Sequence, residues 1–348
     1  MINFFSLSRK SLEKEIESFG KERYRATQLF QWVYRRGMLD FISMTNLSKD
    51  LRGIFQKIFD LRLLPVRDAL HGKDGTIKFA FEADDGHIIE SVFIPEKERN
   101  TLCISSQIGC RMGCTFCVTG RMGFIRNLSV AEIIGQVMGV RHYLKEIPIT
   151  NLVFMGMGEP VDNMENLIPS LEILKDPAGL DFSYRRVTVS SAGLIEGLKT
   201  LEPKSAGIAI SLNASDNATR TSLMPINRLY PIEDIMRYVK AFKGAKRTRV
   251  TLEYVMLKDI NDTLEDAQRL SVLLKGVKCK INLIPYNESP YLKFKAPDSI
   301  AVERFHEYLL NKHFTAIVRA SRGQDIWGGC GQLGMRYLKA GEKAVIGE

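Results

Sequence analysis

The chain has 348 residues, 45% of them hydrophobic, and a formal net charge of +9 at pH 7. This length suits one large domain with a smaller one, and the positive charge favours a polyanionic partner such as a nucleic acid over a merely basic protein. The sequence has neither a run of ~18 apolar residues nor an apolar segment behind a basic start at residues 1–10, which excludes a membrane-spanning or signal-bearing protein and predicts a cytoplasmic one.

Residues 1–70 show a helical pattern that predicts a small accessory domain. Ser11 is the predicted N-cap of a first helix, and further helices are expected near residues 26–36 and 49–59. This segment is basic, which fits either a solvated helical surface or a module that grips a phosphate backbone. Its cationic residues include Lys21, Arg23, Arg25, Arg35 and Arg36.

Residues 71–98 change to a period of two. The segments 76–82 and 87–94 alternate between apolar and polar residues, and Asp84, Asp85 and Gly86 separate them. This pattern predicts a β-hairpin between the helical domain and the rest of the chain.

Strand and helix patterns then alternate through residues 99–348, which predicts a parallel α/β sheet. So many repeats favour a partial or complete (β/α) barrel over an open doubly wound sheet. Strands are expected at 102–105, 151–155, 186–190, 207–212, 249–257, 280–285 and 314–320, and helices at 129–145, 165–175, 232–242, 264–274 and 299–311. Ser129 and Glu132 form a capping-box pattern at the start of the first of these helices.

Reactive residues follow the ends of these strands, where a barrel gathers its active site. Cys110, Cys114 and Cys117 follow the first strand with C-x-x-x-C-x-x-C spacing. Thiolates suit zinc or iron–sulfur clusters, and structural zinc usually has four protein ligands, whereas no partner pair follows here. We therefore favour a 4Fe-4S cluster with three cysteine ligands, which leaves one iron open.

Other strand ends carry weaker signals. Residues 156–160, Gly-Met-Gly-Glu-Pro, fit either an ordinary turn or a backbone that approaches a ligand. Cys330 lies among glycines and is expected to be accessible, whereas Cys103 and Cys279 by themselves read as core residues. Ser190, Ser211, Asn213 and Asn287 suit ribose binding, although each type also serves as a cap or turn residue.

The combined motifs resemble the radical S-adenosylmethionine superfamily, and within it the RlmN/Cfr family of RNA methyltransferases. The similarity covers nearly the whole chain, and its most specific segments are residues 101–110, 155–160, 223–227 and 330–333. The resemblance implies a radical-SAM-type barrel over residues 99–348, the hairpin at 71–98, and a basic RNA-binding accessory domain at 1–70.

The resemblance also implies the cofactors. Cys110, Cys114 and Cys117 would hold the 4Fe-4S cluster, whose open iron binds S-adenosylmethionine, used twice per turnover. Asn213 stands where the family usually has histidine. The remaining cofactor contacts would come from Gly158, Glu159, Ser190, Ser211, Leu212, Asn213 and Asn287.

The same resemblance implies the catalytic roles. Cys330 would be methylated, the methyl carbon would become a radical, and that radical would add to carbon 2 of an adenine. Cys103 would resolve the resulting crosslink through a transient disulfide with Cys330, and Glu90 would accept a proton.

The implied substrates are adenosines in the peptidyl-transferase region of 23S rRNA and beside the anticodon of tRNA. A reducing protein such as flavodoxin or ferredoxin would supply electrons to a monomeric enzyme. The Glu159–Pro160 ending favours carbon 2 over the carbon 8 of Cfr-like enzymes. Two alternatives remain: a Cfr-like carbon-8 methyltransferase, and a zinc-stabilised RNA-binding protein without catalysis.

Overall fold

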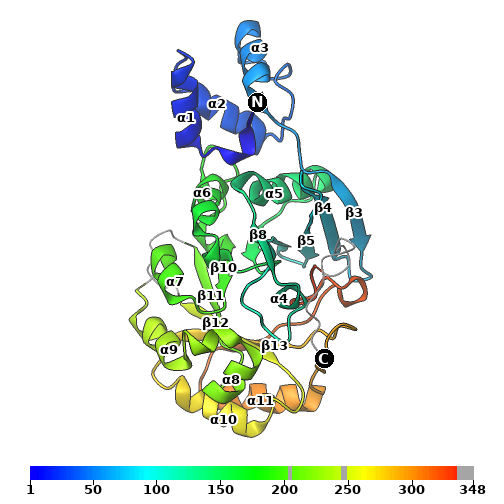
Figure 1. The fold of residues 1–348 in the computed structure, drawn as a ribbon, viewed down its shortest axis with the longest axis vertical. Helices are drawn as coiled ribbons and strands as arrows, with labels where there is room; N and C mark the ends of the chain where they lie inside the picture. Colours follow the sequence, from blue (N-terminus) through cyan, green and yellow to red (C-terminus); the bar gives the residue numbers. More distant parts are fainter. Residues whose placement is uncertain (203–205, 244–248, 335–348) are drawn as a thin grey trace.

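The computed structural model describes residues 1–202, 206–243 and 249–334. A helical N-terminal unit lies at one end of the molecule, beyond α5 and α6, as Figure 1 shows. Its helices are α1 (Arg9–Ser18), α2 (Arg25–Phe30), the π-helical segment η2 (Gln31–Arg35) and α3 (Lys49–Ile58), and a short parallel pair joins β1 (Ile2–Asn3) to β2 (Phe59–Asp60).

Ser8, and not Ser11, caps helix α1. The Ser8 hydroxyl accepts a hydrogen bond from the Ser11 backbone amide at 3.2 Å. The prediction of Ser11 was wrong because an N-cap must have an extended backbone and bond an amide in the first turn, and Ser11 is that first-turn residue.

An aromatic core holds this unit together, and polar contacts join it to the barrel. The rings of Phe30 and Tyr34 lie 4.8 Å apart, and Phe4 packs against both. The Arg9 side chain meets Asp176, just after α6, at 2.9 Å. This contact bridges the two parts of the chain.

One ten-stranded sheet dominates the rest of the molecule. Its order is β14-β13-β12-β11-β10-β9-β6-β5-β4-β3. Seven strands run parallel: β6 (Asn100–Cys103), β9 (Asn151–Phe154), β10 (Val187–Ser191), β11 (Gly207–Ser211), β12 (Val250–Met256), β13 (Cys279–Pro285) and β14 (Ala316–Val318). The order leaves β14 and β3 as edges, so the sheet is not closed, which fits the partial rather than the complete form of the predicted barrel.

The predicted hairpin is present as β4 (Ile77–Glu82) and β5 (Ile88–Pro95). Both strands belong to the large sheet, since β5 pairs antiparallel with β6. Strand β3 (Val66–His71) extends the sheet from within the segment predicted to be helical. Its residues are all exposed or half-buried, so its sequence lacks the alternation that marks a strand with one buried face.

Helices cover the outside of the parallel strands (Figure 1). The capping box predicted at Ser129 and Glu132 is confirmed at the start of α5. Helices α7 and α8, each only seven residues long, were not predicted. The helices of this part are α4 (Val118–Arg121), α5 (Val130–Leu144), α6 (Met164–Lys175), α7 (Ile195–Leu201), α8 (Asn217–Leu223), α9 (Ile232–Ala241), α10 (Leu264–Leu273) and α11 (Ser299–Asn311).

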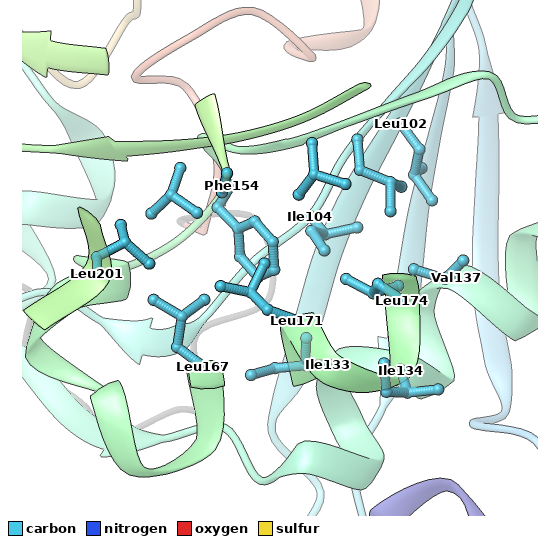
Figure 2. Packing of buried hydrophobic residues seen from close by; sticks show 14 of the residues in the cluster. Leu102, Ile104, Ile133, Ile134, Val137, Phe154, Leu167, Leu171, Leu174 and Leu201 are labelled. Carbon is cyan, nitrogen blue, oxygen red and sulfur yellow. The ribbon is translucent and has the colours of Figure 1, made fainter. Parts of the chain in front are cut away.

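The core lies between the sheet and these helices. Figure 2 shows Phe154 of β9 facing Leu167 and Leu171 of α6, with Ile104 close by, and all four side chains are buried. This packing fixes the end of β9, from which the next loop enters the barrel mouth. Among the described residues, no helix is both long and apolar enough to cross a membrane.

Candidate active site

The loop with the three clustered cysteines lies between β7 (Gln107–Gly109) and α4. Strand β7 pairs with β8 (Phe124–Asn127), so both ends of the loop are anchored. The backbone amide of Cys110 donates to Gly123 O at 2.8 Å. Gly109 has φ +71°, and a Cβ there would lie 1.8 Å from Gly123 O, so this close approach requires glycine.

Cys110, Cys114 and Cys117 face an apolar lining that includes Phe116 and Met224. Burial raises the pKa of all three thiols above the ordinary value. A bound metal reverses this preference, because a coordinated thiol is deprotonated. The donors are therefore soft, buried and grouped on one loop, which suits an iron–sulfur cluster.

In the parts of the chain that are described, no three His, Cys, Asp or Glu side chains gather tightly enough to hold one metal ion. Single-ion coordination requires all ligands within about 2.3 Å of one point. In a 4Fe-4S cluster, each cysteine binds a different iron, so the three sulfurs stand apart.

A cavity opens beside these cysteines at the ends of the parallel strands. It encloses about 880 Å³ of empty space, including some open solvent. Leu212 does not line it, since its fully buried side chain packs in the main core. The other six residues predicted to bind the cofactor do line it: Gly158, Glu159, Ser190, Ser211, Asn213 and Asn287.

Glu159 lines this cavity, and its side chain is buried. Its Oε2 accepts a hydrogen bond from Ala192 N at 2.7 Å, whereas its buried Oε1 has no hydrogen-bond partner among the described residues. Burial raises the pKa of Glu159 to about 7. An acceptor without a partner at a ligand cavity suits an ammonium group, which carries three donors.

Gly158 brings its backbone to the same wall. It has φ +94°, and a Cβ at this position would lie 2.4 Å from Gln107 Cβ. Gln107 in turn accepts from Glu159 N at 2.8 Å. The glycine therefore sets the position of Glu159, and a side chain would displace it.

A second buried carboxylate, Glu253 on β12, was missed by the sequence analysis. Ser190 Oγ donates to Glu253 Oε2 at 2.9 Å, and Oε1 has no hydrogen-bond partner in the described ranges. Burial raises the pKa of Glu253. The available signal was a lone acidic residue inside an apolar strand. With Ser211, which pairs with it across the sheet, Glu253 makes a polar wall suited to hydroxyl groups.

Asn213 has a left-handed backbone, with φ +57°. Its Oδ1 accepts from Val255 N at 2.8 Å, and its Nδ2 lies 3.2 Å from Met224 Sδ. Asparagine tolerates this backbone conformation better than most residues do. Its side-chain oxygen is already engaged in the hydrogen bond from Val255 N. The side chain thus offers the cavity only its amide nitrogen.

Arg220, also missed, ties several strand ends together. Its fully buried guanidinium donates to Ala192 O at 2.7 Å, Leu212 O at 3.0 Å and Asn227 Oδ1 at 2.8 Å. Burial lowers the pKa of Arg220 to about 10. An arginine in a polar stretch of sequence gives no indication that it will be buried.

Cys330 lies in the wall between this cavity and a second one. It lines both cavities, while Cys103 and Arg319 line only the second. Asn287 Nδ2 donates to Cys330 O at 3.3 Å. Burial raises the pKa of Cys103 to about 12 and also raises that of Cys330, where the nearby Arg319 opposes the effect. Both thiols are free, and Cys279 is a buried residue outside both cavities.

Glu90 does not line either cavity. It is buried on β5, where its Oε1 lies 2.9 Å from Lys78 Nζ and its Oε2 accepts from Gly334 N. The loop that carries Cys330 thus covers this carboxylate.

Known protein families match both the N-terminal unit and much of the barrel, and individual relatives match nearly the whole chain. The profile of the ribosomal RNA large subunit methyltransferase N-terminal domain matches residues 2–61, and that of the Radical SAM superfamily matches residues 104–270. The dual-specificity RNA methyltransferase RlmN of Geobacter sulfurreducens is 47% identical over 96% of this chain and 92% of its own length. The protein of that name from Geotalea uraniireducens is 46% identical over 95% and 96%.

A solved structure is also similar. The crystal structure of a radical SAM methyltransferase from Sphaerobacter thermophilus superimposes with a TM-score of 0.90 and 38% identity. The match covers 95% of this chain and 99% of the other. The partial barrel and the helical N-terminal unit therefore occur together in another protein.

Proposed function

Because this chain belongs to the RlmN family of radical S-adenosylmethionine RNA methyltransferases, we propose that it methylates carbon 2 of adenosine in 23S rRNA and in tRNA. The rRNA target would lie in the peptidyl-transferase region and the tRNA target beside the anticodon. One observation carries the proposal: Cys330 separates a cavity with three clustered cysteines from one that contains Cys103. A cysteine in that position can receive a carbon on one side and deliver it on the other.

Cys110, Cys114 and Cys117 would hold a 4Fe-4S cluster, and the adjoining cavity would hold S-adenosylmethionine. Glu159 Oε1 would accept from the ammonium group of S-adenosylmethionine, and Ser190, Ser211, Asn287 and the backbone of Gly158 would line the rest of the molecule. When bound, the cluster and two molecules of S-adenosylmethionine per turnover would supply the methyl group and the radical chemistry that an electron-poor ring carbon requires.

The chain's own residues would carry the carbon. Cys330 would lose its thiol proton and accept a methyl group on sulfur, and that carbon would later bond to carbon 2 of the adenine. Glu90 would accept the proton displaced from carbon 2, and the unpaired electron of the adduct would return to the electron-transfer partner that supplied one electron for radical formation. Cys103 would attack the sulfur of Cys330, so that a disulfide forms and the carbon–sulfur bond breaks. Its electron pair would stay on the carbon, which takes a proton to become the methyl group.

The target adenine would have to leave its stack, because carbon 2 is not reachable while the base is paired and stacked in a helix. The basic N-terminal unit would grip the RNA backbone. We propose flavodoxin or ferredoxin as the electron donor, a monomer as the working form, and the cytoplasm, where both RNAs occur, as its location. The alternative of a non-catalytic zinc protein is set aside, because the relatives are named methyltransferases.

The test is mass spectrometry of nucleosides. Anaerobically reconstituted protein is incubated with a reductant, labelled S-adenosylmethionine and unmodified 23S rRNA or tRNA. Labelled 2-methyladenosine is expected, and its distribution gives the substrate range. Labelled 8-methyladenosine would move the chain to the Cfr-like activity, and no labelled adenosine from protein with an intact cluster would refute the proposal.

Two variants test the cysteine roles in the same assay. Cys330→Ala is expected to keep its iron and to make no methylated RNA; loss of the cluster would instead make Cys330 a ligand. Cys103→Ala is expected to stay covalently attached to RNA, and free protein with unmodified RNA would refute the resolving role. Cys279→Ala, outside both cavities, serves as the control.

A further inference from the structure

A buried ion pair connects the two strands of the β4–β5 hairpin. Lys78 and Glu90 are 3% and 1% exposed, and Lys78 Nζ lies 2.9 Å from Glu90 Oε1. Ala80 pairs with Glu90 and Lys78 with Val92, so the two side chains are diagonal neighbours on one face of the sheet. Lysine and glutamate are almost never fully buried unless they are paired.

The same two side chains hold both ends of the segment that carries Cys330. Lys78 Nζ donates to Trp327 O at 3.2 Å, and Glu90 Oε2 accepts from Gly334 N. Cys330 lies between these two anchoring points. The ion pair therefore sets the position of the cysteine segment relative to the hairpin, as well as the position of Glu90 itself.

Burying such a pair has a cost that calls for an explanation. Removing two charges from water is costly, and well-packed apolar residues of similar volume often do as well or better for stability. Lys78 is one of the five buried residues of β4, and the other four are apolar, so folding alone does not explain a lysine at this position. A carboxylate that must stay charged in a dry site, by contrast, needs a compensating cation next to it.

We propose that Lys78 is a positioning residue for proton removal from the RNA-bound intermediate. This inference rests on the proposed function, in which Glu90 accepts the proton of carbon 2. In that step the carbon–hydrogen bond breaks, the proton goes to a Glu90 oxygen, and the electron pair stays on the adenine, while the unpaired electron of the adduct returns to the electron donor of the proposed function. Lys78 compensates the charge of Glu90 before the transfer, and its bond to Trp327 O keeps Cys330, with the attached adenine, in register with the carboxylate.

The test follows three products in the reconstituted, cluster-containing enzyme: methylated Cys330, 5′-deoxyadenosine, and RNA that is either released or covalently attached. The variants are Lys78→Met, Lys78→Arg, Glu90→Gln and the neutral pair Lys78→Met/Glu90→Gln. Exposed Lys240 on α9 provides the control variant Lys240→Met.

For Lys78→Met, release of methylated RNA should fall about 100-fold, the scale of a positioned general base. Cys330 methylation and 5′-deoxyadenosine formation should stay within about twofold of the wild type, so that attached RNA accumulates. Lys78→Arg, which keeps the charge, should restore at least about a tenth of the release. The double variant Lys78→Met/Glu90→Gln should release at least as much methylated RNA as Glu90→Gln alone, because the two residues act as a unit.

The inference would be overturned if Lys78→Met released methylated RNA at the wild-type rate. It would also be overturned if Lys78→Met lost both Cys330 methylation and RNA attachment, because that result indicates a purely structural role. If Lys78→Met does not fold, the double variant Lys78→Met/Glu90→Gln tests the inference instead, because it leaves no uncompensated buried charge. Failure of this double variant to fold would also show that the role of Lys78 is structural. A wild-type enzyme that makes no 2-methyladenosine would instead refute the proposed function, so the two failures are distinguishable.

Discussion

Glu159→Gln should stabilise the protein at pH 8 and weaken its binding of S-adenosylmethionine. The substitution keeps the shape of the side chain and an oxygen for Ala192 N, but removes the charge of a buried carboxylate, one of whose oxygens has no hydrogen-bond partner among the described residues. Burial raises the pKa of Glu159 from 4.5 to about 7. The native state therefore binds more protons than the unfolded state between these values, and stability falls as pH rises through this window.

The magnitude follows from the size of the shift. A difference of about 2.5 pH units at ~1.4 kcal/mol per unit gives roughly 3 kcal/mol of destabilisation, fully present above pH 7 and absent below pH 4.5. Glu159→Gln should recover a large part of this at pH 8. Urea denaturation of the cluster-free protein measures the change, with the exposed Glu165→Gln as control.

Binding should change in the opposite direction. A charge-assisted hydrogen bond to the ammonium group contributes about 1.5–3 kcal/mol, so the Kd of Glu159→Gln should rise about 10- to 150-fold. Wild-type affinity should be about tenfold weaker at pH 6 than at pH 8, because only about a tenth of Glu159 is ionised at pH 6, whereas the variant should show no such dependence. A variant that is less stable at pH 8, or that binds as the wild type does, would refute this reasoning.

Three further substitutions test the frame of the site. Gly158→Ala should lower the free energy of unfolding by more than about 2 kcal/mol, because its Cβ would clash with Gln107. The control Gly276→Ala, also at positive φ but with nothing near its Cβ, should lower it by only about 1 kcal/mol in the same urea titration. Arg220→Met should destabilise the protein by about 3–5 kcal/mol, because carbonyl groups at the strand ends lose their hydrogen-bond donor. The control Arg228→Met, at an exposed position, should be near neutral, and equal urea midpoints for the two variants would contradict this prediction. Cys110→Ser should lose most of its iron after reconstitution while Cys279→Ser retains it, and unchanged iron content in Cys110→Ser would remove it from the ligand set.

The order of elements was readable from the sequence because periodicity is a local property. The parallel strands and most of the long helices are where their apolar patterns place them, and the capping box at Ser129 is confirmed. Short elements were not readable: α7, α8 and β3 bury too few residues to impose a pattern, and their structure depends on the surfaces against which they pack.

For the active site, local sequence features indicated the kind of chemistry that the residues suit. Two local features carried this information: the spacing of Cys110, Cys114 and Cys117, and the glycines near Glu159. Both are visible in a few adjacent residues, because ligands on one loop are close in sequence and glycine lets a backbone approach a ligand. How groups far apart in the chain come together is visible in the folded structure alone. It placed Cys330 between two cavities, buried Glu253 with one oxygen that has no hydrogen-bond partner among the described residues, and joined Lys78 and Glu90 to both ends of the Cys330 segment. These relations depend on the register and curvature of a sheet built from strands far apart in the chain, and no local pattern records them.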